Sequence, residues 1–147
     1  MTTSSNLTPA AQALQKHLAL IGSDLDAWLE LFSDDAVIEF PYAERLGLAS
    51  ALRGKPAIEE HMRSVLKAMT KLVFSRIVIY PIAGASQAIA EFHADALIGA
   101  EKVPYAQDYI VFAELKDGKI VLYREYWDPI RVGSALHAAA THAEATS

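Results

Sequence analysis

The sequence predicts an α+β fold in which three helices pack on one face of a curved, mostly antiparallel sheet. Apolar residues recur at helical spacing in the first part of the chain, and β-branched and aromatic residues dominate from Leu72 onward. The chain has 147 residues, of which 52% are apolar. A chain of this size is one domain and buries roughly 68–70% of its unfolded surface. The helices and the sheet must therefore share one core.

Each of the three helices has a start signal and an apolar face. The first begins at Thr8-Pro9, a cap followed by proline at the first helical position, and its face is Ala10, Leu14, Leu18 and Ile21. Gly22 ends it. Ser23 with Asp26 resembles a capping box for the second helix, whose face is Leu25, Trp28, Leu29 and Phe32. The third opens at Gly54-Lys55-Pro56, has His61 beside its face, and buries Ile58, Met62, Val65, Leu66 and Met69.

Five strands complete the predicted order. Residues 36–40 stop at Pro41, which is typical of an edge strand, and a loop follows through Leu52. Four further strands are expected over residues 72–82, 87–98, 103–115 and 120–127, joined by turns rich in glycine. We expect a single domain over residues 8–133, with flexible tails at residues 1–7 and 134–147.

Composition excludes several classes of function. Thirteen Lys and Arg against eighteen Asp and Glu give a net charge of −5, which repels nucleic acids and anionic membranes. The chain has no cysteine, so a disulfide framework, a thiol nucleophile and a Cys-ligated zinc are excluded. No apolar run is long enough to span a bilayer, and the first residues lack the order of a signal peptide. A cytoplasmic protein is expected.

The order of elements, with the phrases DLDAWLELFSDDAVIEFP, RGKPAIEEHM, DGKI and REYWDPI in these places, resembles the superfamily of nuclear transport factor 2, ketosteroid isomerase and SnoaL-like polyketide cyclases. The phenazine-biosynthesis A/B proteins and limonene epoxide hydrolase are the most similar branches. The resemblance implies a cone with a deep apolar pocket, a small hydrophobic ligand, no cofactor, and a homodimer formed through the outer face of the sheet. It leaves the reaction open, because this fold hosts enzymes and binding proteins alike.

Three ionisable residues share one face of the strand over residues 87–98. Glu91, His93 and Asp95 alternate with Ala90, Phe92, Ala94 and Ala96. His93-Ala94-Asp95 occupies the place where the epoxide hydrolase carries Arg-x-Asp, so the resemblance makes Asp95 a catalytic acid and His93 its partner. The alternative is that this face lies outward and the three residues are only solvated.

Glu125 is the principal candidate for a catalytic acid or base. Tyr123 and Trp127 share its face of the last strand, so the carboxyl group should be poorly solvated and its pKa raised. The resemblance matches Glu125 to an acid or base residue in both the epoxide hydrolase and the phenazine branches. The alternative is a structural salt bridge with a neighbouring arginine.

His61 and Tyr109 are candidate ligand-binding residues. The phenazine branch has a pocket histidine on its third helix, which matches His61, although a histidine there can also be a satisfied flank residue. The register of the strand over residues 103–115 favours Tyr109 over Asp108 as the inward residue, and its phenol could donate to a ligand oxygen.

Phe40 departs from the resemblance. It stands where ketosteroid isomerase has its proton-abstracting aspartate, so that mechanism is not expected, and with Ile38 it replaces two polar residues of the epoxide hydrolase. We place Phe40 among the residues that contact the substrate, together with Tyr123 and Trp127.

The sequence thus predicts a cofactor-free acid–base enzyme of the isomerase, cyclase or dehydratase type, with Glu125, Asp95 and His93 as catalytic residues. One alternative is an epoxide hydrolase in which Asp95 and Glu125 activate water, and another is a non-catalytic ligand-binding or dimerisation module. A metal bound by these residues is not expected, because their spacing is not diagnostic. Apolar residues of the outer sheet face predict the homodimer: Ile110, Phe112 and Leu122.

Overall fold

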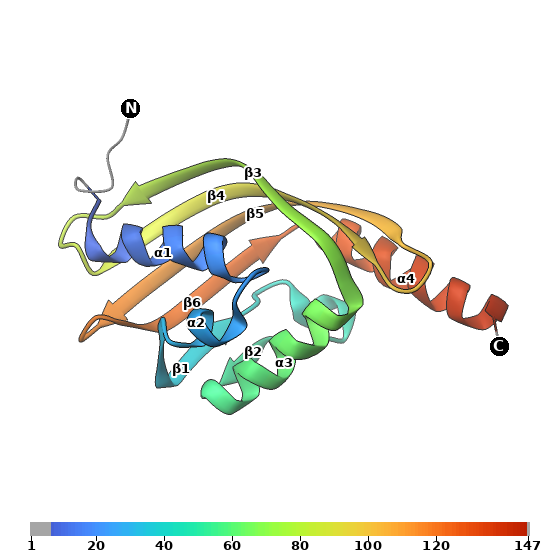
Figure 1. Cartoon of the computed structure of the whole chain (residues 1–147), viewed down its shortest axis with the longest axis horizontal. Coiled ribbons are helices and arrows are strands. Elements are labelled where there is room, and N and C mark those ends of the chain that lie inside the picture. The colour runs from blue at the N-terminus through green and yellow to red at the C-terminus, as the bar shows by residue number, and fades with distance from the viewer. Residues whose placement is uncertain (1–6, 147) are drawn as a thin grey trace.

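A strongly curved six-stranded sheet wraps around three helices on its concave side (Figure 1). The computed structural model describes residues 7–146 and the side chains of residues 7–138. The elements run in the order α1 (Pro9–Leu20), α2 (Leu25–Leu29), β1 (Phe32–Glu39), the 3-10 helix η2 (Ala43–Leu46), β2 (Ala51–Arg53), α3 (Lys55–Ala68), β3 (Met69–Pro81), β4 (Gln87–Ile98), β5 (Val103–Lys116), β6 (Lys119–Trp127) and α4 (Pro129–Thr146). The predicted α+β class and the four later strands are confirmed.

The strands are arranged in the order β2-β1-β6-β5-β4-β3. All neighbouring pairs are antiparallel except β1 and β6, which run parallel. The sequence predicts β1 as an edge strand, and this is wrong. The short strand β2, within the segment expected to be a loop, pairs with the outer side of β1 and takes the edge position.

The helix starts follow local capping chemistry. The Thr8 hydroxyl accepts a hydrogen bond from the Ala11 amide, as its place before Pro9 predicts. The cap of α2 is Asp24, whose carboxylate accepts from the Ala27 amide, and not Ser23 as the sequence suggested. Trp28 and Leu29 of the predicted apolar face are buried in α2, whereas Phe32, which was predicted to belong to the same helix, begins β1.

The core lies between the concave face of the sheet and α1. Small residues of β4, Ala88 and Ala90, are fully buried and let α1 approach the sheet closely. Trp28, Phe32 and Ile120 fill the space beside them. One end of the cone is thus solidly packed, and the opposite end is left open for a cavity.

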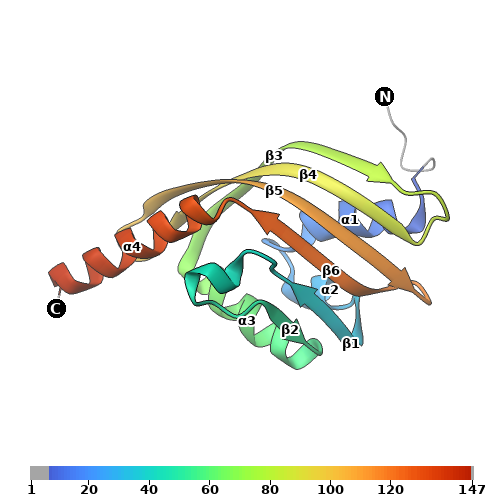
Figure 2. The ribbon, with the colours of Figure 1, turned by 180° about the vertical axis from the view of Figure 1, so that it is seen from behind.

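Helix α4 is an element that the sequence analysis did not predict. It begins directly after β6 and extends away from the sheet (Figure 2). The predicted domain limits, and the flexibility expected of both tails, stay predictions. Residues 1–6 and 147 of those tails lie outside the described part of the chain. None of the described helices combines the length and the apolar character needed to span a membrane.

Candidate active site

An elongated cavity of about 370 Å³ lies between the concave face of the sheet and the helices. This is the size of a typical small-molecule site. Most of its wall is apolar, with contributions from Ile38, Leu52, Val65, Leu66, Phe74 and Phe92 among others. A few polar groups are set into that wall: His17, His61, Tyr109, Tyr123, Glu125 and Trp127. The cavity is therefore built to hold an apolar molecule and to contact it with a small number of polar atoms.

Glu125 of β6 brings a carboxyl group into this wall. It lies between Tyr123 and Trp127 on the inward face of the strand, as the alternation of residues predicted. Burial among apolar groups raises its pKa to about 7, although hydrogen bonds from Tyr123 and Trp127 act in the opposite direction. A carboxyl group with this pKa can both take and give a proton near neutral pH.

A row of buried hydrogen bonds leads from Glu125 to α2. The Tyr123 hydroxyl donates to Glu125 Oε1 at 3.1 Å and lies 2.9 Å from His17 Nε2. The indole N–H of Trp28 donates to His17 Nδ1 at 2.7 Å. His17, Trp28 and Tyr123 are each at most 3% exposed. Burial lowers the pKa of His17 to about 3 and raises that of Tyr123, so both are neutral at ordinary pH.

His17 is a site residue that the sequence analysis missed. It lies three residues after Leu14 and four before Ile21, and therefore on the apolar face of α1. A polar side chain at such a position was the signal that could have identified it.

Tyr109 of β5 faces the cavity, as the predicted register required. Its ring stacks on Phe92 of β4 with centroids 5.0 Å apart. Burial raises the pKa of Tyr109, so its hydroxyl keeps its proton and can donate a hydrogen bond. Its neighbour Asp108 lies on the opposite, exposed face.

His61 and Phe40 form part of the wall next to α3. Their rings are 5.6 Å apart, and both residues line the cavity. Burial lowers the pKa of His61, which makes it a neutral polar group. The five residues expected to contact a ligand, Phe40, His61, Tyr109, Tyr123 and Trp127, thus all line one cavity with Glu125.

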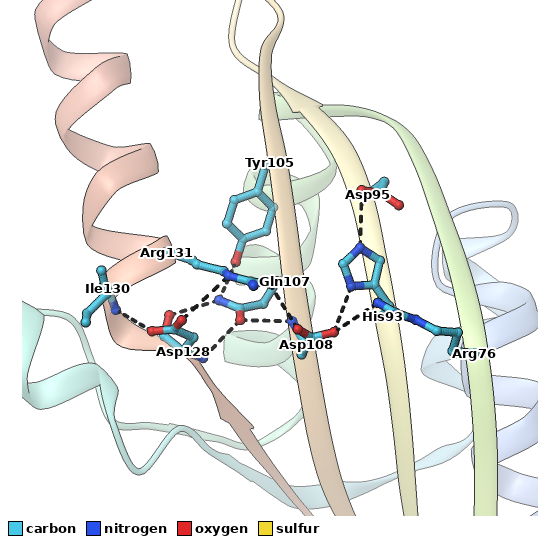
Figure 3. A network of polar contacts seen from close by, with 9 residues as sticks. All are labelled: Arg76, His93, Asp95, Tyr105, Gln107, Asp108, Asp128, Ile130 and Arg131. Carbon is cyan, nitrogen blue, oxygen red and sulfur yellow. Dashed lines mark hydrogen bonds and ion pairs between the residues drawn. The ribbon is translucent and has the colours of Figure 1, made fainter.

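His93 and Asp95 do not lie in the cavity, and their predicted convergence with Glu125 is wrong. Figure 3 shows them on the outer face of the sheet, where His93 lies 3.3 Å from Asp95 and 2.8 Å from Asp108. Hydrogen bonding to Asp108 raises the pKa of His93. The physical reason is the small size of the alternating alanines of β4, which places those alanines, and not the ionisable residues, against the core.

The outer network includes the junction between β6 and α4. Arg131 of α4 forms an ion pair with Asp108 at 3.0 Å. The buried amide of Gln107 donates to the Asp128 carbonyl and accepts from the Asp128 amide, each at 3.0 Å (Figure 3). We name these two hydrogen bonds the Gln107 clamp. The clamp holds the chain in place directly after Trp127.

Comparison with known proteins places this chain in a defined group. The SnoaL-like domain matches residues 13–123. YesE of Bacillus subtilis is 36% identical over 127 residues, which cover 86% of each chain. The PhzA/B-like protein PA3332 of Pseudomonas aeruginosa is 36% identical over 128 residues, covering 86% of this chain and 89% of that protein.

Solved structures share the architecture. A crystal structure of a proposed isomerase from Bacillus subtilis superposes with a TM-score of 0.79 at 36% identity and covers 88% of this chain and 93% of that one. Δ5-3-Ketosteroid isomerase from a Mycobacterium species has a TM-score of 0.70 at 18% identity, and the superposition covers 85% of this chain and 97% of that one. At that level of identity the likeness concerns the fold alone.

Proposed function

The chain belongs to the SnoaL-like domain family, and we propose that it is an acid–base enzyme that moves a proton on a small, uncharged, hydrophobic molecule. The observation that carries the proposal is the position of Glu125, a carboxyl group with a pKa of about 7 in the wall of an apolar cavity. The 36% identical Bacillus subtilis protein of known structure is a proposed isomerase, and isomerisation belongs to this class of reaction.

The charge of the cavity wall supports an uncharged ligand. Among the described residues that line it there is no Lys or Arg, and burial lowers the pKa of both lining histidines. A carboxylate or phosphate on the ligand would lose its hydration without gaining a counter-charge. A ketone, an enol or an alcohol needs only hydrogen bonds, which Tyr109 and the neutral His61 can supply.

In the proposed reaction Glu125 takes a proton from a carbon next to a carbonyl group. The electron pair of the C–H bond forms a carbon–carbon double bond, the π pair of the carbonyl group moves onto its oxygen, and the Tyr109 hydroxyl donates a hydrogen bond to the resulting enolate. Glu125 then returns the proton to another atom of the same molecule. No cofactor enters this scheme, and the same step serves an isomerisation, a cyclisation or a dehydration.

The epoxide hydrolase hypothesis required Asp95 and Glu125 to share one water molecule. Asp95 lies on the outer face of the sheet, so it cannot take part in that step. A binding protein without catalysis is the remaining alternative and is an outcome of the test below.

Hydrogen–deuterium exchange tests the proposal without a known substrate. A panel of uncharged steroid, terpenoid and polyketide-derived ketones is first screened for binding, and ligands that bind are incubated with the protein in D2O. We expect deuterium to enter at the carbon next to the carbonyl group, and Glu125→Gln to reduce that exchange about 100-fold with little change in affinity. Binding without any exchange would identify the domain as a ligand-binding module.

A further inference from the structure

We infer that Trp28 and His17 are positioning residues that commit the Tyr123 proton to Glu125. The inference concerns two side chains of the cavity wall, and it rests on the proposed function only for its catalytic consequence. Its basis is a row of hydrogen-bonded side chains in which each one fixes whether the next acts as donor or acceptor. The row consists of Trp28, His17, Tyr123 and Glu125.

The indole nitrogen of Trp28 starts the row. An indole N–H is a donor only, so the contact of 2.7 Å requires His17 Nδ1 to be an acceptor. A neutral imidazole with an unprotonated Nδ1 carries its hydrogen on Nε2. Trp28 therefore selects one of the two tautomers of His17.

The tautomer then fixes the orientation of the Tyr123 hydroxyl. His17 Nε2–H points at the Tyr123 oxygen across 2.9 Å, so this oxygen accepts from His17 and its own hydrogen must go elsewhere. The acceptor within reach is Glu125 Oε1 at 3.1 Å. With the opposite tautomer, Tyr123 would donate to His17 and leave Glu125 without this hydrogen bond.

This arrangement separates the roles of the two carboxyl oxygens. Oε1 accepts from Tyr123 whether Glu125 is ionised or protonated, because the carbonyl oxygen of a carboxylic acid also accepts. Oε2, which Tyr123 does not contact, is then assigned to take and return the catalytic proton, and the Trp127 side chain is the second donor to the carboxyl group. It also separates the two tyrosines, since Tyr123 is committed to Glu125 and Tyr109 is left to contact the ligand.

Other titratable groups lie near Glu125 and must be followed in the same experiment. His17 of α1, His61 of α3, and Tyr109 of β5 line the same cavity, and Tyr105 of β5 interacts electrostatically with Glu125. Trp28→Phe replaces none of these side chains, and among them only His17 is expected to change, in its tautomer.

Nuclear magnetic resonance tests the inference in the unliganded protein. Nitrogen-15 spectra should show His17 as the neutral tautomer with hydrogen on Nε2, and carbon-13 spectra of labelled glutamate should follow the titration of Glu125. Trp28→Phe should change the tautomer ratio and raise the pKa of Glu125 by up to about one unit, in the same direction as Tyr123→Phe.

Two comparisons separate this effect from a general loss of structure. Phe32→Leu reduces the packing on Trp28, whose ring lies 4.6 Å from that of Phe32, and keeps every hydrogen bond. It should leave the Glu125 titration unchanged. His17→Gln can accept from Trp28 and donate to Tyr123, and should keep the pKa of Glu125 near its original value. His17→Leu should do the same, because it removes the competing partner and leaves Tyr123 to donate to Glu125.

A hydrogen on His17 Nδ1 in the wild type, or a Glu125 titration that is the same in the wild type and Trp28→Phe, would overturn the inference. These results do not depend on turnover. The ketone exchange experiment can therefore fail while the inference holds, and the reverse is also possible.

Discussion

His17 and Glu125 hydrogen-bond to the same hydroxyl group, that of Tyr123, and their pKa values are displaced in opposite directions. The pKa of His17 falls from 6.5 to about 3, and that of Glu125 rises from 4.5 to about 7. Between pH 4.5 and 6.5 the folded protein therefore carries a proton on Glu125 and none on His17. In the unfolded chain His17 carries the proton and Glu125 is ionised.

The first prediction follows from this opposition. The depressed pKa of His17 makes stability fall as the pH drops below 6.5, and the raised pKa of Glu125 makes stability fall as the pH rises above 4.5. The two contributions cancel in the wild type. In Glu125→Gln only the His17 contribution remains, so the free energy of unfolding should rise with pH by up to about 1.4 kcal/mol per pH unit. In His17→Gln only the Glu125 contribution remains, so the free energy of unfolding should fall with pH by up to about the same amount.

Urea unfolding at several pH values in this window measures both slopes relative to the wild type. His61 and His93 also titrate, but they are present in all three proteins, so their contributions are removed by the comparison. If the free energy of unfolding changed with pH in the same way in both variants, the pKa values of His17 and Glu125 would not be displaced in opposite directions.

The second prediction concerns the outer residues. His93→Ala and Asp95→Asn should each leave ketone binding and deuterium exchange within about threefold of the wild type, since surface changes away from a site have small effects. Exchange rates measured beside those of Glu125→Gln provide the comparison. A hundredfold loss of the exchange rate in His93→Ala or Asp95→Asn would show that the outer face of the sheet takes part in the reaction.

The third prediction separates binding from chemistry at Tyr109. Tyr109→Phe keeps the stacking on Phe92 and removes the hydroxyl, so kcat for exchange should fall by about 10- to 1000-fold while KM changes little. The matched control is Tyr80→Phe, which removes a hydroxyl from the neighbouring part of the sheet at an exposed residue outside the cavity lining. If both variants behaved alike, Tyr109 would have no special role toward the ligand.

The fourth prediction is a homodimer through the outer sheet face. Exposed apolar residues of β3 and β5, Val73, Val78, Tyr80 and Ile110, lie on this face, and the Arg124 guanidinium covers Phe112. We expect Ile110→Lys to weaken pairing, and Leu136→Lys on α4 to have no effect. Light scattering at micromolar concentration measures the mass, and a wild-type mass near 16.0 kDa would argue against the dimer.

The sequence predicted the positions of helices and strands better than it predicted which side of a strand faces the core. Helical spacing and a proline at the helix start were sufficient for α1, because both signals are local. The alternation in β4 separated His93 and Asp95 from the alanines correctly, but which set faces the core depends on the packing of α1, which is not local. Glu125 was selected because the resemblance matched it to an acid–base residue and because two aromatic residues share its face; it lies in the cavity wall, and its catalytic role stays a prediction.

Longer-range features were missed for a related reason. Strand β2 has three residues and gains its regular structure only by pairing with β1. The role of His17 depends on Trp28 and Tyr123, and Tyr123 lies 106 residues away along the chain. No local pattern in α1 records such a partner.

The Gln107 clamp makes the far part of α4 mechanically independent of the cavity. It fixes the chain at Asp128, and of the α4 side chains that the structure describes only Val132 reaches the cavity wall. We therefore expect bending beyond that turn to have little effect on Trp127 and Glu125. The helix, about 27 Å long at 1.5 Å per residue over 18 residues, can act as a spacer that carries an attached reporter away from the sheet.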